Sequence, residues 1–490
     1  MRGSFLAASF KQSNKVSKAS PSSPANPRSL HIPLISDTAH FLAVIEELER
    51  LGLKVGKEER EDFSGFKIRP SAVVYASSEE DVVKAVKFAY ERGIPVVPTG
   101  AGTSLSGHLQ CEGCILVDLS KMNKILELNE VDWYVRVQPG VILEDLFKFV
   151  ESKGFFLPPD PASYFMCTVG GAIANSSGGM RGLKYGTFRE WVLAVRVVLP
   201  DGTVVKLGEP FRKNRAGYDL VHLIAGSEGT LGIVTEAWLR VIPKPEGETY
   251  TVMAFVPDLE RAGEIVYQLR VYRVLPDLAE FIDDQVVEAL NRHFNAGLPV
   301  PKGGLMFFRG DEDVKEKVLK VLSGRAEKVE VAKGEEGDEL LRFRAMGALA
   351  LKAEAKYVYV EDIVVPVSRL VEAIRELKRI EEKYKVRMPV IAHIGDGNLH
   401  PNILFDRTEN AEEIFEEVAR IALKFNGSVS GEHGIGVQKA NVMAEQIVNQ
   451  NGEKVLELMY GIKRLFDPKG IMNPGKYVEK AYNYVKSRRP

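Results

Sequence analysis

The stretch Pro98-Thr-Gly-Ala-Gly-Thr-Ser-Leu-Ser-Gly107 directly follows a predicted strand at residues 94–97. Its glycines let the backbone approach a ligand closely, and successive N–H groups can then face an anion such as a pyrophosphate. The stretch is not the dinucleotide-binding fingerprint, because Leu105 stands where another glycine is needed and no helix is expected to begin there. It also lacks the lysine of a P-loop. Taken alone, it fits a structural loop as well as a phosphate-binding one.

The sequence around this loop predicts an α+β fold. Residues 69–99 read as strand, helix and strand, with Ser77 and Glu80 typical of a helix start and Gly93 of a helix end. Farther along, glycine loops become sparse, and long charged helices alternate with strands. One such helix is expected over residues 368–384, where apolar residues recur on one face.

Changes in composition divide the chain of 490 residues, which is too long for a single hydrophobic core. We expect a basic Ser/Pro-rich tail at 1–36, a cofactor-binding domain at 37–242 and an inserted cap domain at 243–431. Residues 432–490 are rich in glycine again at their start and are expected to return to the cofactor-binding domain.

The tail at residues 1–36 holds several Lys and Arg, many Ser and Pro, and no acidic residue. This composition is typical of an organelle-targeting segment. It is equally typical of a disordered tail. The cytoplasm is therefore the default location, and the mitochondrial matrix is the alternative if the tail is a targeting segment.

Charge and cysteine content exclude some classes of partner and cofactor. The formal net charge of −2 gives no reason to expect a nucleic-acid partner. No apolar run reaches the roughly 18 residues that cross a bilayer, although a peripheral membrane contact is left open. Three cysteines cannot form a disulfide framework, so a reducing compartment is expected. We interpret Cys111-Glu-Gly-Cys114 as two small residues at a turn, rather than as a redox pair or half of a zinc site.

Two further loops are equally rich in small residues. They are Cys167-Thr-Val-Gly-Gly-Ala-Ile-Ala-Asn-Ser-Ser-Gly-Gly179 and Ala225-Gly-Ser-Glu-Gly-Thr-Leu-Gly-Ile-Val234. One glycine loop means little, but three in one domain indicate a long ligand that lies across the backbone. A flavin dinucleotide fits that requirement.

Six motifs, in order, resemble the FAD-linked D-2-hydroxyacid dehydrogenases. That family includes the D-lactate dehydrogenases, the flavin subunit of glycolate oxidase and D-2-hydroxyglutarate dehydrogenase, within the vanillyl-alcohol-oxidase-type flavoprotein fold. The motifs lie between Val73 and Gly475 and read PTGAGTSLSG, DPAS with CTVGGAIANSSGG and KYG, AGSEGTLGIVTE, HIGDGNLH, SGEHGIG and DPKGIMNPGK. The resemblance implies a two-subdomain FAD-binding domain with an inserted α+β cap domain that carries the substrate site.

The resemblance places the first loop on the FAD pyrophosphate and the other two on the rest of the cofactor. FAD is expected to be held noncovalently, as is usual in this branch, although His108 follows the first loop. The expected cofactor-binding residues are Pro98, Gly100, Ala101, Gly102, Thr103, Ser104, Gly107, Asp160, Thr168, Gly171, Asn175, Gly178, Tyr185, Glu228, Gly229, Ile233, Val234 and Asn473.

His393 and His400 flank Asp396-Gly397, which is the preferred two-residue turn of a β-hairpin. With that turn, Gly395 faces Asn398 and His393 faces His400. Directly opposed residues have Cβ atoms about 5 Å apart, close enough for two imidazoles to share a metal. The alternative is a histidine pair on a polar surface.

Glu432 and His433 stand between glycines in Ser430-Gly-Glu-His-Gly-Ile-Gly436. Two histidines and a carboxylate leave an open coordination position, as catalytic metal sites require, and the same ligands suit non-haem iron. In a regular strand Glu432 and His433 would point to opposite faces, so we expect the glycines to twist the chain. The resemblance assigns His393, His400 and Glu432 to a divalent metal and His433 to the general base. Zinc is the first choice, with iron or manganese as alternatives.

Two residues are expected to bind substrate. The resemblance favours Arg344 as the partner of a substrate carboxylate, which a guanidinium binds in a bidentate manner. Arg342 is the alternative, because it lies two residues away. Asn402 is expected to project to the same face as His400.

Two positions argue against a substrate with a second carboxylate, such as 2-hydroxyglutarate. Ala348 stands where some relatives have a hydroxyl residue, and Val360 where some have a lysine.

The resemblance implies oxidation of a small D-2-hydroxy acid, of the D-lactate or glycolate type, to the 2-oxo acid. Hydride would pass to the flavin and electrons to a quinone, a cytochrome or an electron-transfer protein. One alternative is a non-redox transferase of the alkylglycerone-phosphate synthase type. Another is a flavin subunit of an electron-transfer complex. A homodimer is left open.

Overall fold

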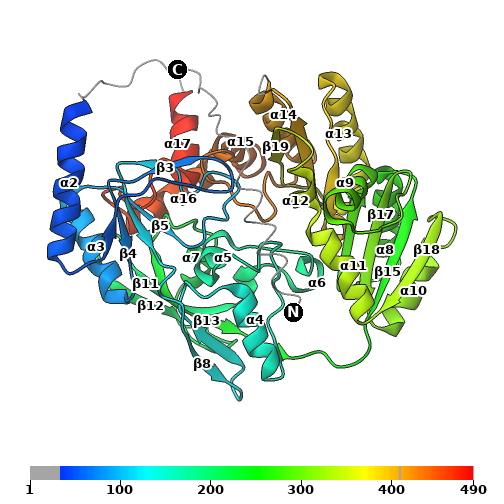
Figure 1. The fold of residues 1–490 in the computed structure, drawn as a ribbon, viewed down its shortest axis with the longest axis horizontal. Helices are drawn as coiled ribbons and strands as arrows, with labels where there is room; N and C mark the ends of the chain where they lie inside the picture. Colours follow the sequence, from blue (N-terminus) through cyan, green and yellow to red (C-terminus); the bar gives the residue numbers. More distant parts are fainter. Residues whose placement is uncertain (1–33, 408–409, 489–490) are drawn as a thin grey trace. The chain divides into compact units, whose positions relative to one another are not determined.

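The computed structural model describes residues 34–407 and 410–488 (Figure 1). Internal contacts divide the chain into two units, Met1–Leu42 and Ala43–Pro490. The described part of the first unit belongs to helix α2 (Leu34–Arg50), which continues into the second. The predicted tail at 1–36 therefore lies outside the described residues, except for the first three residues of this helix.

The predicted strand, helix and strand form part of a mixed sheet with the order β1-β4-β7-β5. Both β4 (Ala72–Tyr75) and β5 (Val96–Thr99) run parallel to β7 (Ile115–Asp118), and β1 (Val55–Gly56) is antiparallel to β4. Helix α3 (Glu79–Arg92) joins β4 to β5. It begins at a capping box of Ser78 and Asp81, one residue beyond the predicted pair, and ends at Gly93.

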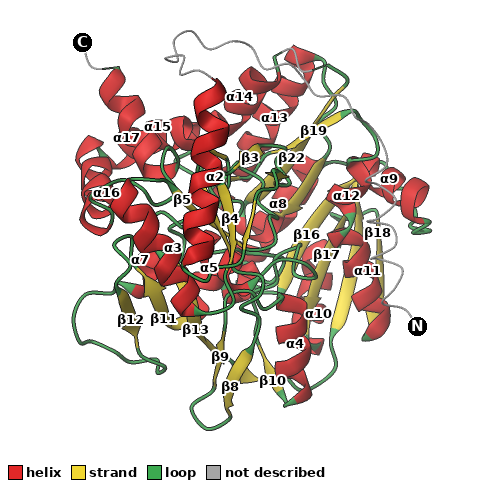
Figure 2. Ribbon diagram, turned by 60° about the vertical axis from the view of Figure 1, so that its left-hand side comes forward, coloured by secondary structure: helices red, strands yellow, loops and turns green. Residues whose placement is uncertain are grey.

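A second, antiparallel sheet has the order β12-β11-β13-β9-β8. Helix α3 contacts strands of both sheets, and Figure 2 shows α3 and α7 beside β11. The strands are β8 (Ile125–Asn129), β9 (Tyr134–Val137), β11 (Val192–Val198), β12 (Val204–Gly208) and β13 (Ile233–Arg240). The connecting helices are α4 (Leu143–Ser152), α5 (Val169–Asn175), α6 (Gly182–Tyr185), the short 3-10 helix η1 (Phe188–Trp191) and α7 (Val221–Ile224).

Residues 250–405 form an eight-stranded antiparallel sheet with the order β18-β15-β17-β16-β21-β22-β19, and β20 also pairs with β22. Figure 1 shows β15, β17 and β18 as neighbours, with α8 and α10 against them. The strands are β15 (Tyr250–Val256), β16 (Leu278–Asp283), β17 (Gly304–Gly310), β18 (Lys328–Lys333), β19 (Tyr357–Val360), β20 (Ile363–Val364), β21 (Val390–His393) and β22 (Asn398–Phe405).

Helices pack against this sheet, and their buried side chains form a hydrophobic core with those of the strands. The helix predicted at 368–384 is α13 (Leu370–Tyr384), and Leu370, Ile374, Leu377 and Ile380 of its apolar face are buried, as the pattern indicates. The others are α8 (Leu259–Val271), α9 (Asp284–Phe294), α10 (Glu312–Leu322), α11 (Glu335–Ala345), α12 (Gly347–Leu351), α14 (Ala411–Lys424) and the 3-10 helices η2 (Val367–Arg369) and η3 (Ile394–Asp396).

The C-terminal segment contacts both the eight-stranded sheet and the sheet that contains β5. Side chains of α15 (Ala440–Asn451), α16 (Glu453–Phe466) and α17 (Tyr477–Ser487) share the core of the eight-stranded sheet. The loop after α16 instead pairs with β5, through a parallel bridge between Met472 and Val96. The predicted domain divisions at 242/243 and 431/432 stay a prediction.

The remaining described strands form two smaller sheets. One has the order β2-β3-β6, and the other pairs β10 with β14. Their bounds are β2 (Arg60–Glu61), β3 (Lys67–Arg69), β6 (Cys111–Glu112), β10 (Phe155–Phe156) and β14 (Ile242–Pro243). Among the described residues, no helix has the length and apolar character needed to cross a membrane.

The register predicted for the histidine hairpin is wrong. His393 pairs with Asn398, and His400 pairs with Ile391, because the connection is a four-residue loop rather than a two-residue turn. Residues 394–396 form the 3-10 helix η3, and Gly397 closes the loop with φ +79°. The pairing is shifted by two residues, so both histidines stay on one face of the sheet.

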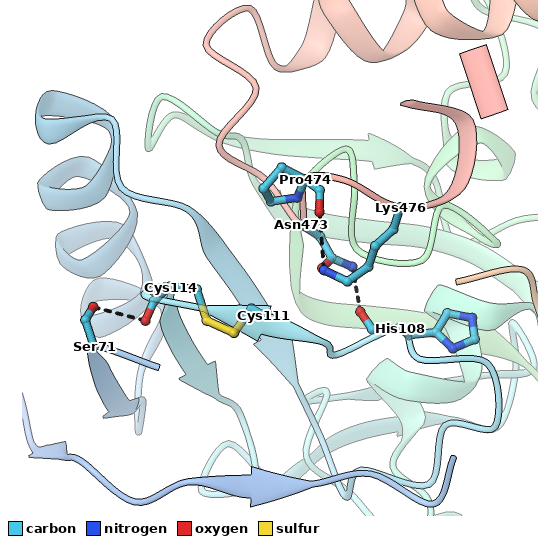
Figure 3. The surroundings of a disulfide bond; sticks show 7 residues. All are labelled: Ser71, His108, Cys111, Cys114, Asn473, Pro474 and Lys476. Atoms are coloured by element: carbon cyan, nitrogen blue, oxygen red, sulfur yellow. Dashed lines mark hydrogen bonds between the residues drawn. A yellow bond between two sulfur atoms is a disulfide. The ribbon is translucent and has the colours of Figure 1, made fainter. Parts of the chain in front are cut away.

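The interpretation of Cys111 and Cys114 as unpaired small residues is also wrong, because a disulfide joins them (Figure 3). Gly113 adopts φ +71°, and the turn brings the two Cα atoms to 6.0 Å, within the range that a disulfide bridges. Both the N–H and the hydroxyl of Ser71 donate to the Cys114 carbonyl, which holds the end of this turn. The third cysteine, Cys167, is free and buried.

We expect the purified protein, denatured without reductant, to present one reactive thiol per chain, that of Cys167. Reduction with a dithiol should raise the number to three, because the chain has three cysteines and one disulfide. A colorimetric thiol titration measures both values, and a Cys167→Ser variant should show none before reduction. Three thiols in the unreduced protein would contradict the disulfide.

Candidate active site

The three glycine loops line one cavity. All but three of the expected cofactor residues lie in its wall, together with Glu432 and His433. They are Pro98, Gly100, Ala101, Gly102, Thr103, Ser104, Thr168, Gly171, Asn175, Gly178, Glu228, Gly229, Ile233, Val234 and Asn473. A wall rich in glycine and other small residues suits a long dinucleotide, as the sequence indicated.

Close packing between the loops explains two of these glycines. A Cβ atom at Gly100 would collide with the Thr168 side chain. At Gly178 it would lie 2.8 Å from Glu432 Oε2, so a side chain there would displace the Glu432 carboxylate. Glycine at 178 therefore lets the second loop pass directly beside the acidic group of the site.

Three of the expected cofactor residues do not line this cavity. Gly107, at φ +72°, packs where a Cβ would collide with Val437. The Asp160 carboxylate accepts the Arg181 N–H at 2.9 Å, and burial raises the pKa of Asp160 to about 6. Tyr185 packs edge-on against Trp191. For these three residues, as for those in the cavity wall, contact with a cofactor stays a prediction.

Glu228 connects the cavity wall to the loop at 430–436, and Asn473 holds Glu228 in place. The Glu228 carboxylate accepts the N–H groups of Ile435 at 2.7 Å and Gly436 at 2.8 Å. The Asn473 amide donates to the carbonyls of Glu228 at 2.8 Å and His108 at 3.2 Å, the latter shown in Figure 3. These bonds fix the position of Glu432 and His433 relative to the glycine loops.

His393, His400 and Glu432 converge on one point. Glu432 Oε1 lies 3.0 Å from His393 Nε2 and 3.3 Å from His400 Nε2. One atom from each residue can be chosen so that all lie within 4.8 Å of one another. The rings of His393 and His400 have centroids 5.2 Å apart, so the histidines meet despite the shifted register.

These three residues fit a metal ion. His400 Nδ1 lies 3.2 Å from the Glu361 carbonyl, to which it can donate, and this leaves the lone pair of the ring on Nε2, the atom that faces Glu432. The pKa of Glu432 is held well below its ordinary value, because His393 and His400 outweigh the effect of burial. Glu432 would therefore offer a metal a negatively charged oxygen, and two imidazoles with one carboxylate are a common set for catalytic zinc.

His433 lies beside this group and lines the cavity. Its ring stacks on that of His400, with centroids 4.7 Å apart. Burial is the main cause that lowers the pKa of His433 to about 4; His400 adds to the effect, and Asp362 opposes it. The imidazole is therefore neutral at neutral pH, and its Nδ1 has no hydrogen-bond partner among the described residues.

Two buried carboxylates that sequence reasoning missed support these residues. Asp362 Oδ2 accepts the N–H groups of Glu432 at 3.0 Å and His433 at 2.9 Å. Both oxygens of Glu280 lie 2.9 Å from His393 Nδ1. The only sequence signal for either is an acidic residue next to or within an apolar strand, in Leu278-Ala-Glu-Phe-Ile282 and Glu361-Asp-Ile-Val-Val365.

Asp362, His400 and His433 also lie close enough together to bind a metal. Asp362 Oδ2 already accepts four hydrogen bonds, from the Ser430 hydroxyl and from the N–H groups of residues 431–433. Its other oxygen accepts from the Asn398 amide. An oxygen with this many donors is a poor ligand, so the group with Glu432 fits a metal better.

The two expected substrate residues differ in their surroundings. Arg344 is 4% exposed, and its Nη2 lies 3.4 Å from His393 Nδ1, whereas Arg342 is exposed, so Arg344 is the arginine beside the site. Asn402 is fully buried in β22 and does not line the cavity. Its amide donates to the carbonyls of His400 at 2.8 Å and Pro389 at 3.3 Å.

Comparison with known proteins identifies the family. A model described as FAD binding domain matches residues 70–208, and one described as FAD linked oxidases, C-terminal domain matches residues 245–477. The chain is 35% identical to glycolate oxidase subunit GlcD of Bacillus subtilis, over 84% of this chain and 89% of that protein. It is also 35% identical to D-lactate dehydrogenase of Anaerostipes hadrus, over 90% of this chain and 97% of that protein.

A solved structure of p-cresol methylhydroxylase with substrate bound shares the fold. Its TM-score is 0.70 at 20% identity, over 90% of this chain and 96% of that one. The α+β fold predicted from the motifs is therefore confirmed. The chain is an FAD-linked oxidoreductase and belongs to the family that includes the D-lactate dehydrogenases and the glycolate oxidase subunit.

Proposed function

We propose that the chain oxidises a small D-2-hydroxy acid, of the D-lactate or glycolate type, to the 2-oxo acid, with a divalent metal at His393, His400 and Glu432. One observation carries the proposal: Glu432, which belongs to a possible metal-binding group with His393 and His400, lies beside the neutral imidazole of His433 in the wall of the cavity lined by the glycine loops. Alcohol oxidation requires a base and a hydride acceptor close together. The names of the two relatives support the substrate class.

The residues of the chain have separate roles in this reaction. Bound FAD would accept the hydride, and a bound divalent cation would lower the pKa of the substrate hydroxyl. His433 takes the hydroxyl proton, because its lone pair is free at neutral pH. Arg344 pairs with the substrate carboxylate. The substrate thus loses a hydride and a proton and becomes the 2-oxo acid.

The side chains at positions 348 and 360 favour a substrate with a single carboxylate. Neither Ala348 nor Val360 can donate to a second carboxylate through its side chain.

We propose zinc as the metal, because it suits two histidines and one carboxylate and has no redox chemistry that would compete with the flavin. Electrons would leave through a quinone, a cytochrome or an electron-transfer protein.

Replacement of His433 by Ala should slow flavin reduction by substrate roughly 100- to 10,000-fold, which is the usual contribution of a general base. The variant should stay yellow, because His433 is one of many residues that line the cavity. Anaerobic stopped-flow absorbance of the flavin measures the rate. His222→Ala is the matched control, since His222 is exposed and does not line the cavity, and it should react at the wild-type rate. Full activity in His433→Ala would exclude the base role.

Removal of the metal with a chelator should abolish flavin bleaching by a 2-hydroxy acid and leave the bound FAD in place. The reason is that the glycine loops supply much of the cavity wall, whereas Glu432 is the one member of the metal group that lines it. Addition of zinc, manganese or ferrous iron in turn should restore bleaching with the native metal. If substrate reduced the flavin of the metal-depleted protein at the normal rate, the metal would have no role in the reaction.

A panel of 2-hydroxy acids, tested anaerobically, should separate the proposed substrates from the rest. Glycolate and D-lactate should bleach the flavin, L-lactate should not, and D-2-hydroxyglutarate should react much more slowly for want of a partner for its second carboxylate. Flavin absorbance reports each reaction directly. If no hydroxy acid bleaches the flavin, a non-redox transferase becomes the better hypothesis for the function of the chain.

A further inference from the structure

We infer that Glu280 is a positioning residue that orients the metal-binding His393 and the substrate-binding Arg344 at the same time. The inference rests on the proposed function, because it assigns Glu280 to two groups of that same site. Glu280 lies in the middle of β16 and is 0% exposed. A carboxylate is stable in such a place only when charged or hydrogen-bonding groups surround it.

The contacts of Glu280 come from two elements of the fold. Its Oε2 lies 2.5 Å from Arg344 Nη2, on helix α11, and 2.9 Å from His393 Nδ1, at the end of β21. Its Oε1 also lies 2.9 Å from His393 Nδ1. Among the described residues, no other acidic side chain forms an ion pair with Arg344.

The first consequence concerns the orientation of His393. A carboxylate beside Nδ1 requires the proton to stay on Nδ1, which leaves Nε2 as the ligand atom. Nε2 is the atom that faces Glu432, at 3.0 Å. Glu280 therefore selects both the tautomer and the ring orientation that a metal at Glu432 needs.

The second consequence concerns charge. Arg344 Nη2 lies only 3.4 Å from His393 Nδ1, so a guanidinium is packed against a ring that would bind a cation. Both groups are buried, where repulsion between like charges is weakly screened. The carboxylate of Glu280 touches both and offsets this repulsion. It allows the arginine and the metal to act on the two ends of one hydroxy acid.

The experiment measures zinc affinity of the FAD-loaded protein by competition with a chromophoric chelator, in the absence of substrate. Glu280→Gln should weaken zinc binding roughly 10- to 100-fold, the usual effect of losing such a supporting group. The KM for D-lactate should rise as well, because Arg344 loses the group that holds it. Flavin content should stay at the wild-type level, since Glu280 does not line the cavity.

A second pair of variants excludes a simple folding defect. Arg344→Met and the double variant Arg344→Met/Glu280→Gln both lack the buried guanidinium, so neither leaves an unpaired arginine. They differ only at Glu280. Zinc affinity should again be about tenfold or more weaker in the double variant. Glu79→Gln is the matched control, because Glu79 pairs with Arg196 in another sheet, and its zinc affinity should equal that of the wild type.

The outcomes separate this inference from the proposed function. If the wild type binds zinc and the variants at Glu280 bind it equally well, Glu280 has no positioning role, while the proposed function stands. An equal loss of affinity in Glu79→Gln would likewise overturn the inference. If the wild type takes up no divalent metal at all, both the metal site and the role of Glu280 fall together.

Discussion

The position of Glu432 and His433 depends on one buried carboxylate, that of Asp362. Its Oδ2 accepts the Ser430 hydroxyl and three successive N–H groups of the loop, at 2.7–3.0 Å. Burial alone would raise the pKa of Asp362, but His433 and Lys439 outweigh it and keep the pKa well below its ordinary value. The carboxylate stays charged and keeps its four donors. The loop has no regular secondary structure, so these hydrogen bonds hold its backbone in place, as the hydrogen bonds between neighbouring strands do in a sheet.

The site joins elements that are distant in sequence. β21 and β22 supply His393 and His400 from the eight-stranded sheet, and the loop held by Asp362 supplies Glu432 and His433. Glu228, from the third glycine loop, accepts two N–H groups of the same loop. Backbone hydrogen bonds therefore fix Glu432 and His433, the proposed ligand and the proposed base, relative to the cavity.

The sequence predicted several of the elements and named residues that the structure brings together at the candidate site, but it did not reveal which groups hold them there. Residues 72–99 follow local patterns, so β4, α3 and β5 were predictable, with the cap displaced by one residue. The hairpin register was not, because Asp396-Gly397 is part of a longer loop, and the two-residue shift kept the histidines together only because side chains alternate between faces. Glu280 and Asp362 carry no motif, and their partners lie far away along the chain. The proximity of Cys111 and Cys114 depends on a turn that a count of cysteines does not reveal.

We propose that His393, His400 and Glu432 bind one metal ion beside the flavin cavity. Anomalous diffraction from crystals of the FAD-loaded protein, recorded at the absorption edge of the bound metal, would locate that ion. We expect one peak per chain, with both histidine Nε2 atoms and a Glu432 oxygen about 2.0–2.2 Å away. A peak at Asp362 and His433, a peak elsewhere, or a metal-free site in a protein that still oxidises substrate would contradict it.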